Sequence, residues 1–253
     1  MSHPFPEPHA KTGSVPADGV DGARAPAVPS VPDYLRKVYW WAYVHPRAVS
    51  LFEREWLVNL ILFGNYARLR NAALAEIDPQ SHQRVLQVAC VYGDLTPRLL
   101  RRLGPDATLD VADVLPIQLQ NLRRKLPPEP PEPRVTLLQR DAAALGVADG
   151  SYDCVLLFFL LHEQPEPVRR ATLAEALRVV KPGGKIVIVD YHRPSRTNPL
   201  YLPMRTLLRR LEPYAEDLWR HELQHFFPAG VQVESSTHRT WFGGLYQMLV
   251  LKR

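Results

Sequence analysis

The chain has 253 residues, of which 46% are hydrophobic and 23% charged, with two cysteines and a formal net charge of +5. A chain of this length buries a sufficient core without disulfides or metal ions. Cys90 and Cys154 lie far apart in apolar stretches, which excludes a disulfide-built secreted fold and favours a reducing compartment. The longest strongly apolar run, residues 56–63, is interrupted by Asn59 and is too short to cross the roughly 30 Å hydrocarbon layer. We therefore expect a protein that is soluble or lies on a membrane surface.

Residues 1–32 are rich in proline and glycine. They contain seven prolines and three glycines, and their charged residues give a net charge of −1. Such a segment offers few side chains to bury, so we predict a disordered tail. The basic excess therefore belongs to the rest of the chain.

Aromatic residues are concentrated in the next segment. Nine of the 23 aromatic side chains lie between residues 31 and 73. Pro46 suits a first helical turn, and apolar side chains follow at the helical spacing of three or four residues: Val49, Phe52, Trp56, Leu60 and Phe63. We predict a helical subdomain over residues 33–78 that faces a membrane or forms an entrance for a ligand.

From residue 79 onward, short apolar runs alternate with longer amphipathic segments. The predicted strands are 84–90, 108–114, 134–139, 152–159, 185–191, 231–235 and 245–251, and the predicted helices are 96–103, 116–126 and 168–180. The alternation is typical of βαβ units, and the last two strands are expected to close the sheet as an antiparallel pair. The sequence thus predicts an α/β domain over residues 79–253 with a seven-stranded, mostly parallel sheet.

Four motifs in this order resemble those of class I S-adenosylmethionine-dependent methyltransferases, which have a Rossmann-like fold. They are VLQVACVYGD at 85–94, Asp113 after the second strand, RDA at 140–142 with DGSYD at 149–153, and VKPGG at 180–184. The resemblance implies that Asp113 binds the ribose, because one carboxylate can accept from two vicinal hydroxyls. It also implies a cofactor site completed by four further residues: Val114, Asp141, Ala142 and Phe158.

The first motif departs from the family pattern. Gln87 replaces the usual acidic residue, Ala89 and Val91 replace two glycines, and Tyr92 precedes the retained Gly93. A glycine-rich turn lets backbone amides approach the methionine end of the cofactor closely. We therefore expect that end of the cofactor to sit differently, against Gln87, Ala89, Tyr92 and Gly93.

The altered motif, with YWWAYVHP at 39–46 and VDYHRP at 189–194, resembles the RquA-type rhodoquinone biosynthesis proteins over residues 31–253. The resemblance implies conversion of ubiquinone to rhodoquinone, in which an amino group replaces a ring methoxy group. S-adenosylmethionine is then the nitrogen donor, and a divalent metal, manganese in particular, is required. The alternatives are a conventional quinone or phenol methyltransferase and a non-catalytic relative that binds the cofactor or the quinone.

Gln87 and Tyr92 suggest how such a reaction differs from methyl transfer. An amine attacks a quinone carbon only when it is unprotonated, and a carboxylate beside it would raise its pKa. A neutral Gln87 removes that stabilisation of the ammonium form; the alternative is a position that has merely lost its acid. Tyr92 binds the cofactor or the quinone, acts as an acid or base, or fills the space of the missing glycines.

Polar side chains follow the fourth and fifth predicted strands, in FFLLHE at 158–163 and DYHR at 190–193. Strand ends of a parallel sheet converge on one crevice. We predict catalytic roles for Tyr92, His162 and Tyr191, and a manganese or magnesium site with three ligands: Glu163, Asp190 and His192. In ordinary methyltransferases, a histidine at the position of His162 is not a metal ligand.

Residues 221–225, HELQH, match the zinc-protease signature HExxH. We reject a protease because that site needs a third ligand and another fold. The motif lies in a variable stretch, residues 194–228, which is expected to form a lid. His225 is the residue of this motif that would point into the pocket.

Basic residues cluster in two stretches. One set lies among the tryptophans: Arg36, Lys37, Arg47, Arg54, Arg68 and Arg70. The other lies around the lid: Arg193, Arg196, Arg205, Arg209, Arg210 and Arg220. Cationic faces beside apolar side chains suit an anionic membrane surface, from which a lipid-soluble ubiquinone would be drawn; a solvated rim is the alternative. We expect a cytoplasmic protein, peripheral on the inner face of the membrane, without nucleic-acid partners. The sequence specifies no oligomeric state.

Overall fold

A computed structural model describes residues 29–39, 53–128, 134–231 and 233–253 of the chain. The predicted tail over residues 1–32 lies almost entirely outside the described residues. The same holds for Pro46, Val49 and Phe52 of the predicted aromatic helix.

The described chain contains one seven-stranded sheet. Its strands are β1 (Arg84–Val88), β2 (Thr108–Asp113), β3 (Val135–Gln139), β4 (Tyr152–Phe158), β5 (Val180–Tyr191), β6 (Ser235–Trp241) and β7 (Tyr246–Lys252). The strand order is β3-β2-β1-β4-β5-β7-β6. The first five strands pair in parallel, and β7 runs antiparallel to both β5 and β6. The predicted α/β fold with a mostly parallel sheet is confirmed.

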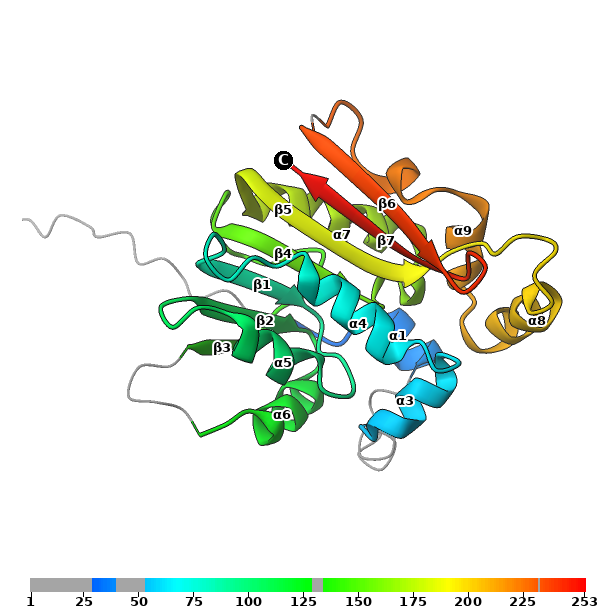
Figure 1. Cartoon of the computed structure of the whole chain (residues 1–253), viewed down its shortest axis with the longest axis horizontal. Coiled ribbons are helices and arrows are strands. Elements are labelled where there is room, and N and C mark those ends of the chain that lie inside the picture. The colour runs from blue at the N-terminus through cyan, green and yellow to red at the C-terminus, as the bar shows by residue number, and fades with distance from the viewer. Residues whose placement is uncertain (1–28, 40–52, 129–133, 232) are drawn as a thin grey trace, which may run out of the picture.

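Helices cover both faces of the sheet (Figure 1). They are α1 (Asp33–Val38), α3 (Glu55–Ile61), α4 (Tyr66–Ala75), α5 (Leu95–Arg102), α6 (Pro116–Lys125), α7 (Glu166–Val179), α8 (Tyr201–Leu211) and α9 (Ala215–Arg220), with short 3-10 turns η2 (Leu161–Glu163) and η3 (Leu223–Phe226). Helix α7 begins before the predicted residue 168 because Pro167 is tolerated in a first turn, where its missing N–H has no intrahelical partner.

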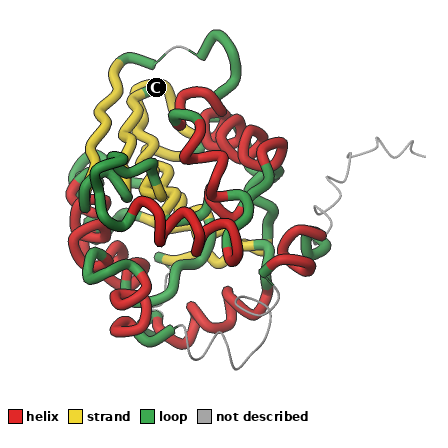
Figure 2. Tube along the Cα trace, turned by 90° about the vertical axis from the view of Figure 1, so that its right-hand side faces the viewer, coloured by secondary structure: helices red, strands yellow, loops and turns green. Residues whose placement is uncertain are grey.

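Alternating strand residues supply two hydrophobic cores, one on each face of the sheet. On one face Leu156 and Val187 share a core with Leu69 of α4 and Leu99 of α5. On the other face, a second core is formed by Val155 and Ile186 of the strands and Leu173 and Leu177 of α7. Figure 2 shows the strands between these helices from the side. Helix α4, from the predicted 33–78 subdomain, therefore packs directly on the sheet.

The predicted apolar stripe of the aromatic segment turns outward in the structure. Trp56, Leu60 and Phe63 are 60%, 65% and 42% exposed. Helix α3 is short, and the chain leaves it through Phe63 and Gly64, both of which have positive φ angles. Among the described helices, none combines the length and apolar character that crossing a membrane requires.

The predicted sixth strand, residues 231–235, is wrong. The strand that pairs with β7 is β6, which begins at Ser235. Six of its seven residues are exposed, because β6 is the edge strand of the sheet. An edge strand without a buried face carries no alternating apolar pattern, so Val231 and Val233 gave a misleading signal.

The loop after β1 is held in place by Tyr66 of α4. The Tyr66 hydroxyl donates to the Tyr92 carbonyl oxygen at 3.2 Å and accepts from the N–H groups of Asp94 and Leu95 at 3.0 and 3.2 Å. Gly93 has a φ of +82°, and a Cβ atom there would lie 2.6 Å from the Tyr66 oxygen. The one retained glycine of the first motif is therefore required by the contact with α4.

We expect Gly93→Ala to lower the free energy of unfolding by roughly 2–5 kcal/mol, since it combines a strained φ with a clash against Tyr66. Gly183→Ala is the matched control, because Gly183 has a φ of +75° but open space around it. The control should lose only roughly 1–2 kcal/mol. Urea denaturation of both variants measures this, and equal losses would contradict the role given to Tyr66.

Candidate active site

A cavity of about 630 Å³ opens at the carboxyl ends of the parallel strands. Its wall combines the loops after β1, β2 and β4 with the end of β5 and with side chains of α1, α3 and α8. Ligands of open α/β sheets bind at this edge because the strand ends and helix N-termini converge there.

Asp113, at the end of β2, is on the cavity wall together with Val114. One carboxylate oxygen accepts from the Cys90 N–H at 2.7 Å, and the other accepts from the Leu115 N–H at 2.8 Å. Burial raises the pKa of Asp113 to about 6, although these two backbone N–H groups oppose the shift. The Cys90 thiol also hydrogen-bonds this carboxylate, whose place on the cavity wall fits the predicted binding of the ribose hydroxyls.

Gln87, predicted to contact the cofactor, lies behind the cavity wall. Its side chain is fully buried, donates from Nε2 to the Ala89 carbonyl oxygen at 2.9 Å and accepts from the Thr96 hydroxyl at 2.9 Å. Ala89 is on the wall and has a φ of +70°, which is unusual for a residue with a Cβ. The direct contact predicted for Gln87 is therefore wrong; its amide holds the strained Ala89 in place.

Tyr92 is on the cavity wall, and its hydroxyl accepts from Gln118 Nε2 at 2.9 Å. Burial raises the pKa of Tyr92 above its ordinary value, so the side chain is a neutral phenol at neutral pH. Gly93 is not part of the wall formed by the described residues. It faces Tyr66, and its N–H donates to Glu53 at 3.1 Å, so the predicted cofactor contact of Gly93 is also wrong.

The predicted adenine-side residues Asp141 and Ala142 are both on the wall, as is Phe158 at the end of β4. Asp141 accepts the Ala143 N–H at 2.9 Å, which fixes the turn after β3. Phe158 packs edge-on against Phe159, with ring centres 5.1 Å apart. The structure thus brings these three residues to the same cavity as Asp113.

His162 faces the cavity and is held from behind by Asp190. The distance between His162 Nδ1 and Asp190 Oδ1 is 2.9 Å, and the Asp190 side chain is fully buried. Burial alone would lower the pKa of His162, but the nearby carboxylates, Asp190 above all and then Glu212 and Glu163, together raise this pKa to about 9. The imidazole is therefore protonated on both nitrogens and positively charged at neutral pH. Glu163 also lines the cavity, with its carboxylate 3.7 Å from His162 Nε2.

The predicted metal ligands do not come together. Of the three, only Glu163 is on the cavity wall, as is the predicted catalytic residue Tyr191. Successive residues of a strand point to opposite faces of the sheet. Because Tyr191 points to the cavity, its neighbours Asp190 and His192 point away from the cavity. Asp190 instead accepts the backbone N–H groups of Leu161 and Tyr191, at 2.8 and 2.7 Å. The predicted set does not fit a manganese ion, and we assign no metal to this cavity.

Glu212, at the end of α8, is a cavity residue that the sequence did not reveal. Its Oε2 atom is buried, and the Tyr39 side chain hydrogen-bonds the carboxyl group. Burial raises the pKa of this carboxyl, while the positive charge of His162 opposes the shift. A lone acid at the end of a basic helix gave no sequence signal for a buried group.

The HExxH motif does not reach the cavity. The rings of His221 and His225 stack on each other with centres 4.2 Å apart, and His225 Nε2 lies 3.0 Å from Arg170. The expectation that His225 points into the pocket is wrong. From the predicted lid, residues 194–228, Leu207 and Glu212 contribute to the wall instead.

Part of the cavity wall is apolar and is formed by α3 and α8, where the lining residues Leu60, Ile61 and Leu207 are exposed; we call this part the apolar mouth. Leu57, Val58 and Ile61 of α3 line it together with Leu207 of α8. Seven large apolar side chains are exposed on these helices and on the turns next to them: Trp56, Leu60, Ile61, Phe63, Leu202, Leu207 and Phe242. Phe63 and Phe242 stack with ring centres 5.9 Å apart.

The predicted basic surfaces are weaker than the sequence implied. Arg70 is buried and forms ion pairs with Glu55 and Asp94, so its assignment to a surface is wrong. Glu216 pairs with three arginines of the second set: Arg205, Arg209 and Arg220. Arg47 lies outside the described residues.

Known proteins resemble this chain in sequence. Residues 85–184 match a family model described as a methyltransferase domain, Methyltransf_25. The ubiquinone/menaquinone biosynthesis C-methyltransferase UbiE of Pseudomonas paraeruginosa (strain DSM 24068 / PA7) is 31% identical over 140 residues, covering 55% of this chain and 54% of that protein. UbiE of Stutzerimonas stutzeri (strain A1501) is 31% identical over 146 residues, covering 57% and 56%. The chain thus spans about half the length of the curated relatives it matches.

Solved structures resemble it in fold. The mitomycin 7-O-methyltransferase MmcR superimposes with a TM-score of 0.62 at 20% identity, covering 86% of this chain and 61% of that one. Human N-acetylserotonin methyltransferase, in complex with S-adenosylmethionine, gives a TM-score of 0.57 at 14% identity, covering 88% and 60%. The chain therefore has the Rossmann-like α/β fold of class I methyltransferases, and its residues 85–184 match a methyltransferase domain.

Proposed function

We propose that this protein is an S-adenosylmethionine-dependent transferase that aminates the ring of ubiquinone, replacing a methoxy group to give rhodoquinone. The observation that carries the proposal is a single cavity with two kinds of wall. Asp113 and Asp141 provide carboxylates suited to a nucleoside, whereas α3 provides an apolar mouth suited to a polyisoprenoid quinone. The charged His162 lines the same cavity.

The chain's own residues fit the nucleoside part of S-adenosylmethionine. Asp113 offers the ribose hydroxyls a carboxylate on the cavity wall, and Asp141 and Ala142 stand where the adenine is expected. When bound, S-adenosylmethionine supplies the transferred group. The similarity of residues 85–184 to methyltransferase domains supports this cofactor.

The loop after β1 supports amination. Its Ala89 N–H already donates to the Ala112 carbonyl oxygen and its Cys90 N–H to Asp113, both at 2.7 Å, so these amides are not free for the methionine end. Gln87 is neutral and adds no negative charge behind the loop, unlike the acid usual at this position. An amine near a neutral group loses its proton more readily than one beside a carboxylate, and only the unprotonated amine is a nucleophile.

His162 supports attack on a quinone ring. Because Nδ1 is bonded to Asp190, the Nε2 proton is the one that can be donated to a quinone carbonyl oxygen. Such a hydrogen bond withdraws electrons from the ring and makes the carbon that bears the methoxy group more electrophilic. The methoxy group would leave as methanol with a proton from the attacking amine. Water would then cleave the bond between this nitrogen and the α-carbon of its donor, which releases the aminated quinone. The Glu163 carboxylate lies 3.7 Å from the Nε2 atom of His162.

Methyl transfer to a quinone or phenol is the second candidate. The similarity to UbiE, which is named as a quinone C-methyltransferase, favours it. The same cofactor and the same apolar mouth would serve, so only the transferred group distinguishes the two candidates.

We further propose that the apolar mouth rests on the cytoplasmic membrane surface. Trp56 and Leu60 on α3 and Leu202 on α8 are exposed beside the cavity opening. Large apolar side chains on neighbouring helices bury their surface at the boundary between headgroups and acyl chains. The free thiols of Cys90 and Cys154 suit the reducing side of that membrane.

We expect ubiquinone, incubated with the protein and S-adenosylmethionine labelled at the α-nitrogen, to yield a product that carries the label. Mass spectrometry measures the outcome, with and without added Mn²⁺. A methyl gain without labelled nitrogen would establish the second candidate instead. Binding of both compounds without any product would leave a non-catalytic relative.

Replacing His162 by Gln should lower the transfer rate by roughly 10²–10⁴-fold, because a proton donor is lost. The wild-type rate should fall as the pH rises through about 9, where the imidazolium deprotonates, and this decline should be absent from the variant. His82→Gln is the control, since His82 is also buried but lies before β1, outside the cavity wall. A wild-type profile that is flat around pH 9 would argue against His162 as the donor.

The same protonation should stabilise the fold. The pKa of His162 is raised from 6.5 to about 9, so its contribution is complete below pH 6.5 and is lost as the pH rises through 9. The loss should be on the order of 3 kcal/mol in the free energy of unfolding. Urea denaturation at several pH values tests this, and His162→Gln should remove most of the dependence.

The double substitution Trp56→Ser, Leu60→Ser should lower binding to anionic phospholipid vesicles roughly tenfold or more, since it removes two exposed apolar groups. Val233→Ser is the control, because Val233 is 38% exposed but lies before β6 rather than at the mouth. Flotation measures the bound fraction. Equal losses in both variants, or no wild-type binding, would refute the membrane surface.

A further inference from the structure

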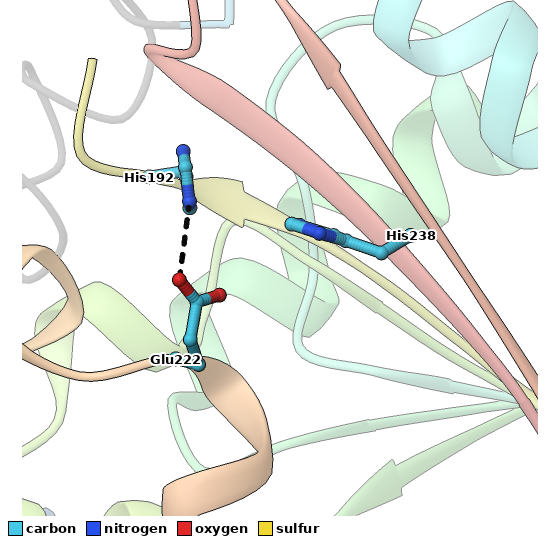
Figure 3. A group of neighbouring side chains, drawn as sticks. All are labelled: His192, Glu222 and His238. Atoms are coloured by element: carbon cyan, nitrogen blue, oxygen red, sulfur yellow. Dashed lines mark ion pairs between the residues drawn. The ribbon is translucent and has the colours of Figure 1, made fainter. Parts of the chain in front are cut away.

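Three potential metal ligands meet outside the cavity (Figure 3). His192 follows β5, His238 lies in β6, and Glu222 immediately precedes η3. One ligand atom of each lies within 4.8 Å of the others, and His192 Nε2 is 3.9 Å from a Glu222 oxygen. None of the three belongs to the wall of the cavity described above.

The hydrogen bond of His192 leaves its outer nitrogen available. Nδ1 lies 2.7 Å from the Gly244 carbonyl oxygen, which can only accept, so Nδ1 carries the proton. In the neutral ring the lone pair is therefore on Nε2, the atom that faces Glu222. Metal-binding histidines are oriented by a hydrogen bond of this kind from the second nitrogen.

His238 is oriented by Gln247 in the same way. The Gln247 amide donates from Nε2 to the Tyr191 carbonyl oxygen at 2.8 Å, which fixes its Oε1 as the atom that faces His238 Nε2 at 3.1 Å. His238 Nε2 therefore donates, and Nδ1 keeps the lone pair. His238 is exposed on the edge strand, and Nδ1 is the ring atom left for an ion.

We propose that His192, Glu222 and His238 bind a divalent transition-metal ion of the zinc class. Two imidazoles and one carboxylate are a common zinc ligand set, with water in the remaining position, whereas Mg²⁺ and Ca²⁺ prefer oxygen ligands alone. Ligands of a shared zinc ion lie about 3.3 Å apart, given bonds of about 2 Å. The Glu222 side chain is 66% exposed and can close the remaining gap.

The ion would join two parts of the molecule. Glu222 belongs to the segment between β5 and β6 that also supplies Leu207 and Glu212 to the cavity wall, whereas His192 and His238 belong to the sheet. Binding therefore fixes this segment against the sheet, next to Tyr191. The carboxylate comes from the HExxH sequence, but its histidines do not contribute, because His221 and His225 stack on each other near Arg170.

Titration of the chelator-treated full chain with Zn²⁺ in a calorimeter tests the site. We expect one ion per chain at micromolar or lower concentrations, with Mn²⁺ bound more weakly. Glu222→Gln and His238→Ala should each weaken Zn²⁺ binding by at least tenfold, whereas His225→Ala should leave it unchanged. Absence of binding below millimolar Zn²⁺ would overturn the proposal, as would loss of binding in the His225 variant alone.

Hydrogen exchange tests whether the ion fixes the segment that carries Glu222 against the sheet; we call this link the bridge. Zn²⁺ should slow exchange in residues 201–226 of the wild type by several-fold but have no such effect on Glu222→Gln. Unchanged exchange in the zinc-bound wild type would refute the bridge. Neither measurement uses a quinone or S-adenosylmethionine, so each outcome is independent of the proposed amination.

Discussion

The buried carboxylate of Asp190 determines the arrangement at the end of β5. It accepts the backbone N–H groups of Leu161 and Tyr191 and pairs with the ring of His162, and its side chain has no exposure to solvent. Removing His162 would leave this buried charge without its ion-pair partner, which is costly in a protein interior. Asp190 therefore holds the turn after β4 against β5. It also keeps the ring of His162 protonated and facing the cavity.

Tyr191 and His192 occupy different environments because they follow Asp190 on the same strand. The alternation of side chains in a strand turns Tyr191 to the cavity and His192 to the opposite side, beside Glu222. Gln247 bonds the Tyr191 carbonyl oxygen and also faces His238. One strand end thus connects the cavity to the outer cluster through backbone and side-chain hydrogen bonds.

The sequence predicted the fold well because the signals of a buried parallel sheet are local. The boundaries of β1 and β2 agree within two residues, since each is a run of apolar residues buried on both faces. Asp113 and Asp141 were found because the resemblance to methyltransferase motifs places them after β2 and β3, and both line the cavity. Strand β6 was misplaced because its polar, exposed residues are ordered only by pairing with β7.

The site was predicted less completely because its details depend on side-chain direction. A strand end that carries Asp190, Tyr191 and His192 cannot aim all three at one ion, and the sequence does not say which residue faces inward. The position of Gln87 in the first motif predicted a contact with the cofactor, but its side-chain amide is hydrogen-bonded to Ala89 and Thr96. No sequence pattern identified Glu212 as a cavity residue, because its burial depends on how α8 packs over the sheet.

The distribution of charge bears on the membrane attachment that we propose for the apolar mouth. Glu216 neutralises part of the charge of the arginines around it, and Arg70 is withdrawn into the core by Glu55 and Asp94. Exposed ion pairs of this kind contribute little attraction at a distance, and salt screens what remains within about 10 Å. The exposed apolar side chains of α3 and α8 are not screened by salt. The membrane attachment that we propose would therefore depend mainly on apolar burial, and moderate salt should weaken it far less than it would weaken a purely basic patch.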